Sequence, residues 1–246
     1  MPPLRPYQTE LSYSYAPGIF PSMALLQTAP ERAMRLLLSA QAHGEGIEKL
    51  RSLCAMHRIR EETADRALAK ISGKQNCFAA VVFAKWQAEL HPSLPHVLLH
   101  HPMDEGNLGT IQRTLLGFGI HDIAIIRPAA DVFDPHVVRA SMGAIFSLRV
   151  KQYDSFEGYR SEFPSHALYP FMLDGSLPLE KAACTHQNPY TLIFGNEGSG
   201  LPQAFSKIGQ AVRIPHSDAI DSLNLAVAVG LGAYAFIHAE NKEDSQ

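Results

Sequence analysis

The sequence predicts an α/β protein in which a small N-terminal α/β domain precedes a larger domain built on a parallel β-sheet. From Val97 onward, short apolar runs alternate with segments of helical periodicity, which is the pattern of repeated βαβ units. The preceding stretch Gln87–His96 is polar and holds two prolines, as linkers often do. A chain of 246 residues can form two modest domains. We therefore assign residues 1–90 to the small domain, 91–96 to a linker and 97–246 to the C-terminal domain.

The N-terminal domain carries a mixture of both periodicities, and its first ten residues are expected to be loose. Its predicted helices cover residues 19–26, 46–56 and 64–71. Its predicted strands cover residues 34–38, 57–61 and 78–83, the last of which is the apolar run FAAVVF.

The C-terminal domain has a regular alternation of elements. Its predicted strands cover residues 97–100, 122–126, 146–150, 168–173 and 192–195, and a short strand ends at Ile214 and Pro215. Predicted helices cover 108–118, capped by Asn107, 135–142, capped by Asp134 with a proline at its first position, and 155–163. Such a parallel sheet is covered on both faces, and its ligands bind beyond the carboxyl ends of its strands.

The last predicted helix, which ends near Ile237, is small and apolar on every side. Asp221 and Ser222 can cap it. Because an all-round apolar helix does not face water, it is expected to be buried in its own domain, against another subunit, or both. Ser222 and Asn224 lie at its first turn, where free backbone N–H groups are available to a ligand.

Composition excludes several classes of protein. The formal net charge of −3 and the pI near 6.4 give no global basic field, so nucleic-acid binding would need a local patch. Three cysteines without a CxxC pair indicate a reducing cytoplasm. No signal peptide is expected in MPPLRPYQTE. The longest apolar run is shorter than the roughly 18–20 residues that span a bilayer, so a soluble protein is predicted.

Common cofactor and nucleophile motifs are absent from the sequence. It contains no GxGxxG after a strand, no GxxxxGK[ST] phosphate loop and no GxSxG nucleophile elbow. Four histidines, at positions 91, 96, 100 and 101, cluster near the linker but lack cysteine or acidic partners at a zinc spacing. No metal site is predicted.

Three blocks of the C-terminal domain carry a family resemblance. DEGNLGTIQRTLLGFG, LIFGNEGSGLP and IPHSDAIDSLNLAVA resemble, in this order, the three motifs of the SpoU/TrmH RNA ribose methyltransferases of the SPOUT superfamily. DPHVVRASMGAIF resembles the intervening helix of that family. YSYAPGIFPSMALLQTAPERAMRLLLS and ISGKQNCFAAVVF more weakly resemble the ribosomal-protein-like RNA-binding domain that often precedes it.

The resemblance implies a fold and an activity. It implies that the C-terminal sheet is threaded into a deep trefoil knot, that the knot loops bind S-adenosylmethionine, and that two subunits pack through the knotted region. The implied reaction transfers a methyl group to a ribose 2′-hydroxyl of structured RNA, either rRNA or tRNA, chosen by the N-terminal domain.

The resemblance also implies where the cofactor binds. Gly195, Ile214 and Leu223 match positions whose backbone contacts the cofactor, and Asn196 and Gly200 belong to the same glycine-rich loop. Glycine permits a close approach between backbone and ligand. From the residues alone, Gly195 could equally be a turn glycine, and Ile214 and Leu223 could be core residues.

Five further positions match the family's catalytic residues: Asn107, Arg113, Glu197, Ser222 and Asn224. Arg113 and Arg139 are candidates for RNA contact. A guanidinium, with a pKa above about 12, is a poor general base, so we favour Arg113 as a clamp on the target phosphate. Glu197 would fix Arg113 or hold its own loop. Asn224 would tie the motif loops together or orient the substrate, and Ser222 would lie near the transferred methyl group.

Two other functions fit the sequence. One is a base methyltransferase of the same superfamily. The other is an RNA-binding or assembly protein that keeps the fold but turns over poorly. Glu105 favours the latter, because the family usually has proline there and an acidic residue repels RNA phosphate.

Overall fold

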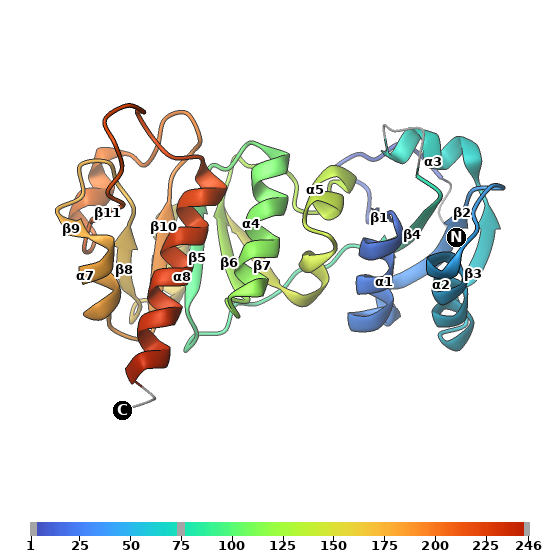
Figure 1. The fold of residues 1–246 in the computed structure, drawn as a ribbon, viewed down its shortest axis with the longest axis horizontal. Coiled ribbons are helices and arrows are strands. Elements are labelled where there is room, and N and C mark those ends of the chain that lie inside the picture. Colours follow the sequence, from blue (N-terminus) through green and yellow to red (C-terminus); the bar gives the residue numbers. More distant parts are fainter. Residues whose placement is uncertain (1–3, 73–76, 244–246) are drawn as a thin grey trace. The chain divides into compact units, whose positions relative to one another are not determined.

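The computed structural model describes residues 4–72 and 77–243, which form two compact units. Unit 1 comprises the chain up to Trp86 together with Leu108–Arg113 and Asp131–Ser147. Unit 2 comprises Gln87–Asn107, Thr114–Ala130 and the chain from Leu148 onward. Figure 1 traces both in sequence colours. The predicted domain limits stay a prediction, and this grouping adds two later segments to the N-terminal unit.

Unit 1 is built on a four-stranded sheet in the order β1-β4-β2-β3, in which β4 pairs antiparallel with β1 and β2, and β3 pairs parallel with β2. The strands are β1 (Tyr13–Pro17), β2 (Ala33–Leu38), β3 (Arg60–Thr63) and β4 (Ala79–Ala84). The helices are α1 (Ile19–Thr28), α2 (Glu45–Met56) and α3 (Asp65–Ser72), with a 3-10 turn, η1 (Pro30–Arg32), before β2.

Two strands of unit 1 differ from the sequence prediction. β3 lies three residues later than predicted, and its four side chains are exposed at the sheet edge, so no apolar pattern marks it. β1 was not predicted. It is buried along its whole length, including Ser14, so it lacks the alternation that marks a half-buried strand. The Ser14 hydroxyl donates to the Phe133 carbonyl, which satisfies it inside the core.

The segment Asp131–Ser147 packs within unit 1 although it lies far along the chain. It contains α5 (Pro135–Ala140), capped by Asp134 as predicted, and η2 (Ala144–Ser147). Phe146 meets Phe83 edge-on at 5.0 Å between ring centroids. The strand predicted over residues 146–150 therefore begins only at Arg149, because Phe146 is buried in a 3-10 turn of unit 1.

Unit 2 contains the predicted parallel sheet, with five strands in the order β7-β6-β5-β10-β8. The strands are β5 (His96–His100), β6 (Asp122–Ile126), β7 (Arg149–Tyr153), β8 (Ala167–Pro170) and β10 (Tyr190–Phe194). Two further short strands, β9 (Leu177–Pro178) and β11 (Val212–Arg213), pair with each other. Because β10 lies between β5 and β8, the loops after β5 and β10 leave the sheet side by side.

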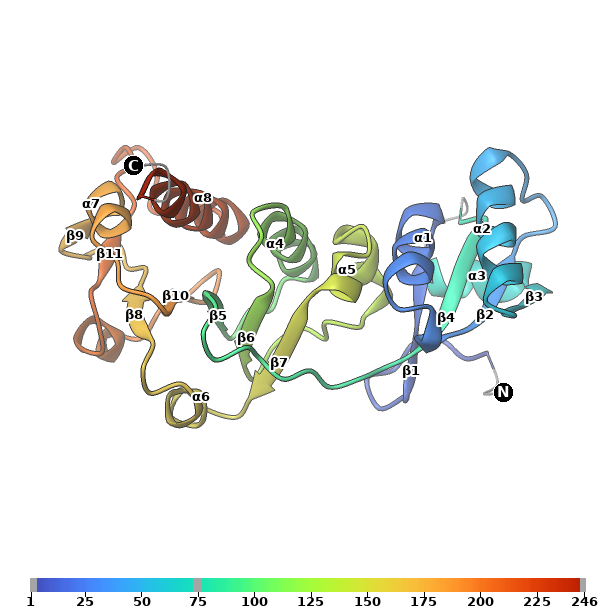
Figure 2. The same cartoon turned by 90° about the horizontal axis from the view of Figure 1, so that it is seen from below.

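Helices cover both faces of this sheet, as Figure 2 shows for α6 on one side and α4, α7 and α8 on the other. They are α4 (Glu105–Gly117), α6 (Phe156–Glu162), α7 (Leu179–Cys184) and α8 (Leu225–Glu243), with η3 (Gln203–Lys207) between β10 and β11. The middle of α4, Leu108–Arg113, is grouped with unit 1. Within the described residues, none of the helices combines the length and apolar character needed to cross a membrane.

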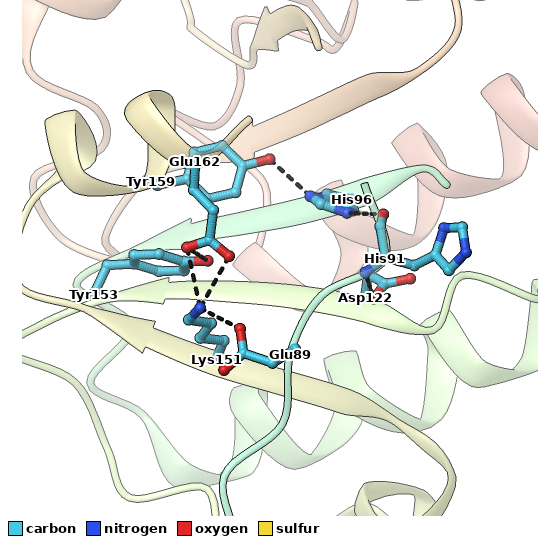
Figure 3. A network of polar contacts seen from close by, with 8 residues as sticks. All are labelled: Glu89, His91, His96, Asp122, Lys151, Tyr153, Tyr159 and Glu162. Carbon is cyan, nitrogen blue, oxygen red and sulfur yellow. Dashed lines mark hydrogen bonds and ion pairs between the residues drawn. The ribbon is translucent and has the colours of Figure 1, made fainter. Parts of the chain in front are cut away.

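The amino ends of the strands in unit 2 carry a buried polar network (Figure 3). Asp122 is fully buried and accepts hydrogen bonds from Arg149 Nε at 2.7 Å and from the backbone N–H of His91 at 2.9 Å. His96 is also fully buried, with its Nε2 2.9 Å from the His91 carbonyl and its Nδ1 2.9 Å from the Tyr159 hydroxyl. The network therefore holds the segment preceding β5 onto the sheet.

Two more side chains extend this network. His166, also buried, lies with Nε2 3.0 Å from the Pro92 carbonyl, and its ring centroid is 4.3 Å from that of His96. Lys151 pairs with Glu89 and with Glu162, the latter at 2.9 Å. Residues of the predicted linker are thus fixed to unit 2 by side chains from β5, β6 and the segment before β8, and Lys151 of β7 binds Glu89 just before the linker.

Burial lowers the pKa of His96 from 6.5 to about 4, and burial likewise lowers the pKa of His166. The folded protein therefore binds fewer protons than the unfolded chain over this interval. The free energy of unfolding that depends on neutral His96 is fully present above pH 6.5, and it is lost as the pH falls toward 4. We expect the free energy of unfolding to drop by about 2 kcal/mol from His96 alone between neutral pH and about pH 5.

Urea titrations at several pH values measure this drop. His96→Gln should be less stable at neutral pH but should lose less stability on acidification. The exposed His136→Gln serves as the control and should follow the wild-type curve. Equal acid losses in wild type and His96→Gln would contradict the assignment.

Candidate functional site

Segments that follow three strands of unit 2 (β8, β10 and β11) line one cavity of about 400 Å³. The β10 loop (residues 195–201) and the β11 loop (residues 214–224) line it, together with residues that follow β8. In Figure 1 the β11 loop forms the long connection at the upper edge of the drawing that leads into α8. A further loop, the β5 loop (residues 101–104), is joined to the β10 loop by hydrogen bonds. The cavity lies within the size range of small-molecule sites, about 300–1,000 Å³.

Glu197 joins the β10 loop to the β5 loop. Its Oε2 accepts a hydrogen bond from the backbone N–H of Met103 at 3.2 Å, and its Oε1 accepts one from Asp104 at 3.1 Å. Asn196 Nδ2 donates to the His101 carbonyl at 2.8 Å and to Glu197 Oε2 at 3.2 Å. The carboxylate thus joins the β10 loop to the β5 loop, and a contact with Arg113 stays a prediction.

The β10 loop folds back on itself as a tight hairpin. Asn196 and Gly200 exchange two backbone hydrogen bonds of 3.1 and 2.9 Å, and Gly200 adopts φ +66°. Asn196 Oδ1 also accepts from the Gly198 N–H at 2.9 Å. A Cβ on Gly195 would lie 2.1 Å from the Gly200 carbonyl carbon, so this position excludes any side chain. Glycine at 195 is therefore required by the close backbone crossing.

Asn224 caps α8 and ties it to α4. Its Oδ1 accepts hydrogen bonds from the N–H groups of Ala226 at 2.9 Å and Val227 at 3.3 Å, which is the N-cap geometry. Its Nδ2 donates to Asn107 Oδ1 at 3.0 Å. This is the tie between motif loops that was expected of Asn224. The prediction that Asp221 and Ser222 cap this helix was wrong, because the helix begins later, at Leu225.

The prediction that Asn107 caps α4 was also wrong. α4 begins at Glu105, and Asp104 accepts a hydrogen bond from the Asn107 N–H at 2.6 Å. Asn107 therefore lies inside the first turn, where its side chain is free to pair with Asn224 instead of capping its own helix. The sequence prediction began the helix at the first apolar residue, Leu108, and missed Asp104 as its cap.

The predicted site residues differ in where they lie relative to the cavity. Seven of them line the cavity: Gly195, Asn196, Glu197, Gly200, Ile214, Ser222 and Leu223. Asn107 and Asn224 connect the helices beside it. Arg113 is exposed on α4, and its side chain has no hydrogen bond or ion pair within residues 4–72 and 77–243. Arg139 lies on α5 in unit 1, partly buried, and its Nη1 is buried without a hydrogen-bond partner in the described chain.

Several lining residues were missed from the sequence. Phe171 and Phe194 stack at 4.2 Å between ring centroids and form part of the wall. Asp174 follows β8 and accepts from Gln203 Nε2 at 3.0 Å, and both line the cavity, as does His216. The signal for Asp174 was available, because it follows a predicted strand at the edge where ligands of parallel sheets bind.

Two adjacent histidines lie where β5 ends: His100 is its last residue, and His101 is the first residue of the β5 loop. The rings of His100 and His101 are 3.8 Å apart, and His101 adopts φ +57°. Burial lowers the pKa of His100, and the neighbouring His101 lowers it further. In the part of the chain that the structure describes, no three His, Cys, Asp or Glu side chains are grouped to hold a metal ion.

Comparison with known proteins places this geometry in context. Residues 95–234 match the SpoU rRNA Methylase family. The chain is 31% identical over 139 residues to an uncharacterized tRNA/rRNA methyltransferase of Synechocystis, covering 56% of this chain and 51% of that protein. It is 34% identical over 140 residues to a 23S rRNA uridine 2′-O-methyltransferase of Streptomyces viridochromogenes, covering 54% and 48%. The chain thus spans about half the length of these two relatives.

Solved structures share the fold over most of the chain. An AdoMet-bound rRNA methyltransferase from Sinorhizobium meliloti superposes with a TM-score of 0.78 at 23% identity, covering 92% of this chain and 87% of that one. The SpoU methyltransferase AviRb from Streptomyces viridochromogenes, in complex with AdoMet, gives 0.78 at 23% identity and covers 94% and 92%. At this identity the likeness concerns the fold of both units.

A substitution at Gly195 tests whether the close backbone crossing in the β10 loop requires glycine. Gly195→Ala should lower the free energy of unfolding by roughly 2–4 kcal/mol, because the new methyl group overlaps the Gly200 backbone. Gly198→Ala is the matched control, since its Cβ would meet nothing closer than Asn196 Oδ1 at 3.5 Å. Thermal unfolding of both variants measures the difference. Similar melting temperatures would show that the loop relaxes away from the crossing.

Proposed function

The chain belongs to the SpoU rRNA methylase family, and we propose from this premise that it is an S-adenosylmethionine-dependent RNA methyltransferase acting on a ribose 2′-hydroxyl. The observation that carries the proposal is the convergence of the three motif loops. Glu197 holds the β5 loop, and Asn224 joins α8 to Asn107. Residues more than a hundred positions apart in sequence are thereby held beside one cavity.

The cavity suits the proposed cofactor in size and in chemistry. S-adenosylmethionine supplies a methyl group activated by attachment to a sulfonium. Gly195 has no side chain, Ile214 and Leu223 line the cavity, and Asn196 and Gly200 shape the hairpin. Stacked Phe171 and Phe194 supply an apolar wall. Such a mixture of backbone polar groups and apolar surface is typical of nucleoside-binding pockets.

Arg113 is the residue that we propose to hold the target nucleotide. Its guanidinium is exposed and has no ion-pair partner in the described chain, so its five N–H donors are free for phosphate. A fixed phosphate orients the neighbouring 2′-hydroxyl, and orientation supplies much of the rate in a transfer reaction. Ser222 lines the cavity, and we place it near the transferred methyl group. The hydroxyl proton passes to the phosphate or to water.

We propose structured RNA, either rRNA or tRNA, as the substrate, with unit 1 selecting it and Arg139 contributing a phosphate contact. The family resemblance also leads us to propose that the part of unit 2 beyond β8 forms the trefoil knot and that the enzyme works in the cytoplasm. The choice of RNA is supported by the 23S rRNA methyltransferases and the putative tRNA methyltransferase among the relatives.

Methyl transfer tests the function directly. Purified protein, labelled S-adenosylmethionine and total RNA from cells lacking this protein should yield labelled RNA with a 2′-O-methyl group that blocks alkaline cleavage at one linkage. Arg113→Lys should lower the rate about a hundredfold, because an ammonium cannot make the paired phosphate contacts. Arg127→Lys is the control, since Arg127 is an exposed arginine outside the three motifs.

The other outcomes decide between the alternatives. Label on a base would favour the base methyltransferase. Cofactor binding without transfer to RNA would favour the assembly protein, the function that Glu105 had suggested. Near-normal turnover by Arg113→Lys would contradict the phosphate clamp.

We also propose that two copies associate through α8. Its buried face includes Val229, Ala233 and Phe236, whereas Val227, Leu231 and Tyr234 are 51%, 41% and 53% exposed. The exposed three lie at i, i+4 and i+7, so they form one apolar face. A second copy of the same face would cover it symmetrically.

Measured mass tests this association. The wild-type protein should have the mass of a dimer in light scattering or sedimentation, and Val227→Glu combined with Leu231→Glu should yield a folded monomer. Met56→Glu, at a methionine 74% exposed on α2, is the control and should leave the mass unchanged. A monomeric wild type at micromolar concentration would contradict the proposal.

A further inference from the structure

The cavity has an uneven balance of charge. Among the described residues that line it, Asp174 and Glu197 are carboxylates, and none is a lysine or an arginine. His216 also lines it, with Nδ1 2.9 Å from the Ile214 carbonyl. With its imidazole neutral, the lining carries only negative formal charge. Such a lining favours a ligand that brings positive charge.

The two carboxylates are not equivalent. Both oxygens of Glu197 accept hydrogen bonds from the loops, two of them from backbone N–H groups of the β5 loop. Asp174 has a single side-chain partner, Gln203, whose Nε2 donates to Oδ2 at 3.0 Å. Oδ1 of Asp174 accepts no hydrogen bond from the described chain. Both oxygens of Glu197 are therefore used to hold the loops, whereas Oδ1 of Asp174 is available to a ligand at the cavity wall.

We propose that Asp174, oriented by Gln203, makes the cavity discriminate the charged methyl donor from the uncharged product. The proposal rests on the proposed function for the identity of the ligand. S-adenosylmethionine carries a sulfonium, an ammonium and a carboxylate, so its net charge is positive. S-adenosylhomocysteine lacks the sulfonium and is neutral overall.

The reaction itself removes the charge that Asp174 attracts. The bond between the methyl carbon and sulfur breaks with both electrons going to sulfur, which becomes a neutral thioether. A new bond forms between the methyl carbon and the 2′-oxygen, and the hydroxyl proton leaves to solvent. The attraction between the Asp174 carboxylate and the ligand is thus strongest before transfer and weaker after it, which favours product release.

The expected effect is modest because Asp174 is exposed to solvent. Interactions of this kind are screened and contribute about threefold to fivefold in an equilibrium constant. Asp174→Asn keeps the shape of the side chain and an oxygen for Gln203, so it removes the charge alone. It should weaken donor binding about threefold to fivefold and leave product binding within about twofold.

Calorimetric titration of the full-length protein tests the proposal without any turnover. The probes are S-adenosylmethionine, S-adenosylhomocysteine and sinefungin, in which an amine-bearing carbon replaces the methylated sulfur and keeps the positive charge. Measurements at mildly alkaline pH keep imidazoles neutral. In Asp174→Asn the preference for the two cationic ligands over the product should fall, and in wild type it should fall with added salt.

Two further variants sharpen the result. Glu157→Gln removes the same charge from the first turn of α6, outside the cavity lining, and should leave all three affinities unchanged. Gln203→Lys places an ammonium beside Asp174 and should reduce the preference as Asp174→Asn does.

Each outcome has one meaning. An unchanged donor-to-product ratio in Asp174→Asn, with tight binding retained, would overturn this inference and leave the proposed function intact. Absence of binding of all three probes to wild type would instead contradict the proposed function. An equal loss for donor and product would assign Asp174 to the shape of the cavity and overturn the charge-based selection.

Discussion

The arrangement of unit 2 depends on a carboxylate that binds backbone. Glu197 accepts hydrogen bonds from the Met103 and Asp104 N–H groups, which precede α4 and have no partner inside that helix. A charged acceptor on such donors forms a strong interaction, and removing it would leave N–H groups without a partner. The β5 and β10 loops therefore take up one arrangement. The position of Asn107, three residues after Asp104, follows from that arrangement, and so does its pairing with Asn224.

In unit 2 the buried polar network and the cavity lie at opposite ends of the parallel strands. At the amino ends of its strands, His96, Asp122 and Arg149 form a buried polar network in which the polar groups pair with side chains or with the backbone of the preceding segment. At the carboxyl ends, the loops leave main-chain groups and a cavity exposed. This division is physically reasonable, because the carboxyl ends of parallel strands converge on one edge where several loops can contribute to a single ligand.

Close backbone contacts shape the cavity wall in unit 2 and also hold α4 against α5 in unit 1. Gly195 crosses the Gly200 backbone, and Gly109 on α4 lies so near α5 that a Cβ would be 2.5 Å from Ala140 Cβ. Gly232 on α8 similarly lies against Phe171 and Phe194, with a notional Cβ 2.8 Å from Phe171. These contacts bring rigid elements closer together than side chains would allow. Among the described residues that line the cavity, Asp174 and Glu197 are carboxylates, and none is a lysine or an arginine.

The sequence alone determined the class of the fold, the parallel sheet and the motif blocks, because apolar periodicity and glycine spacing are local properties of the chain. It also identified seven residues that line the cavity, including Gly195, Ile214 and Ser222. Only the tertiary structure decided which side chains pair. Asp104 rather than Asn107 caps α4, Asn224 rather than Asp221 or Ser222 caps α8, and Phe146 packs in unit 1 rather than in a strand. Several neighbouring residues have a similar local preference for a cap position or for a place in the core. The choice is made by partners that are distant in sequence, such as Asn107 for Asn224 and Phe83 for Phe146.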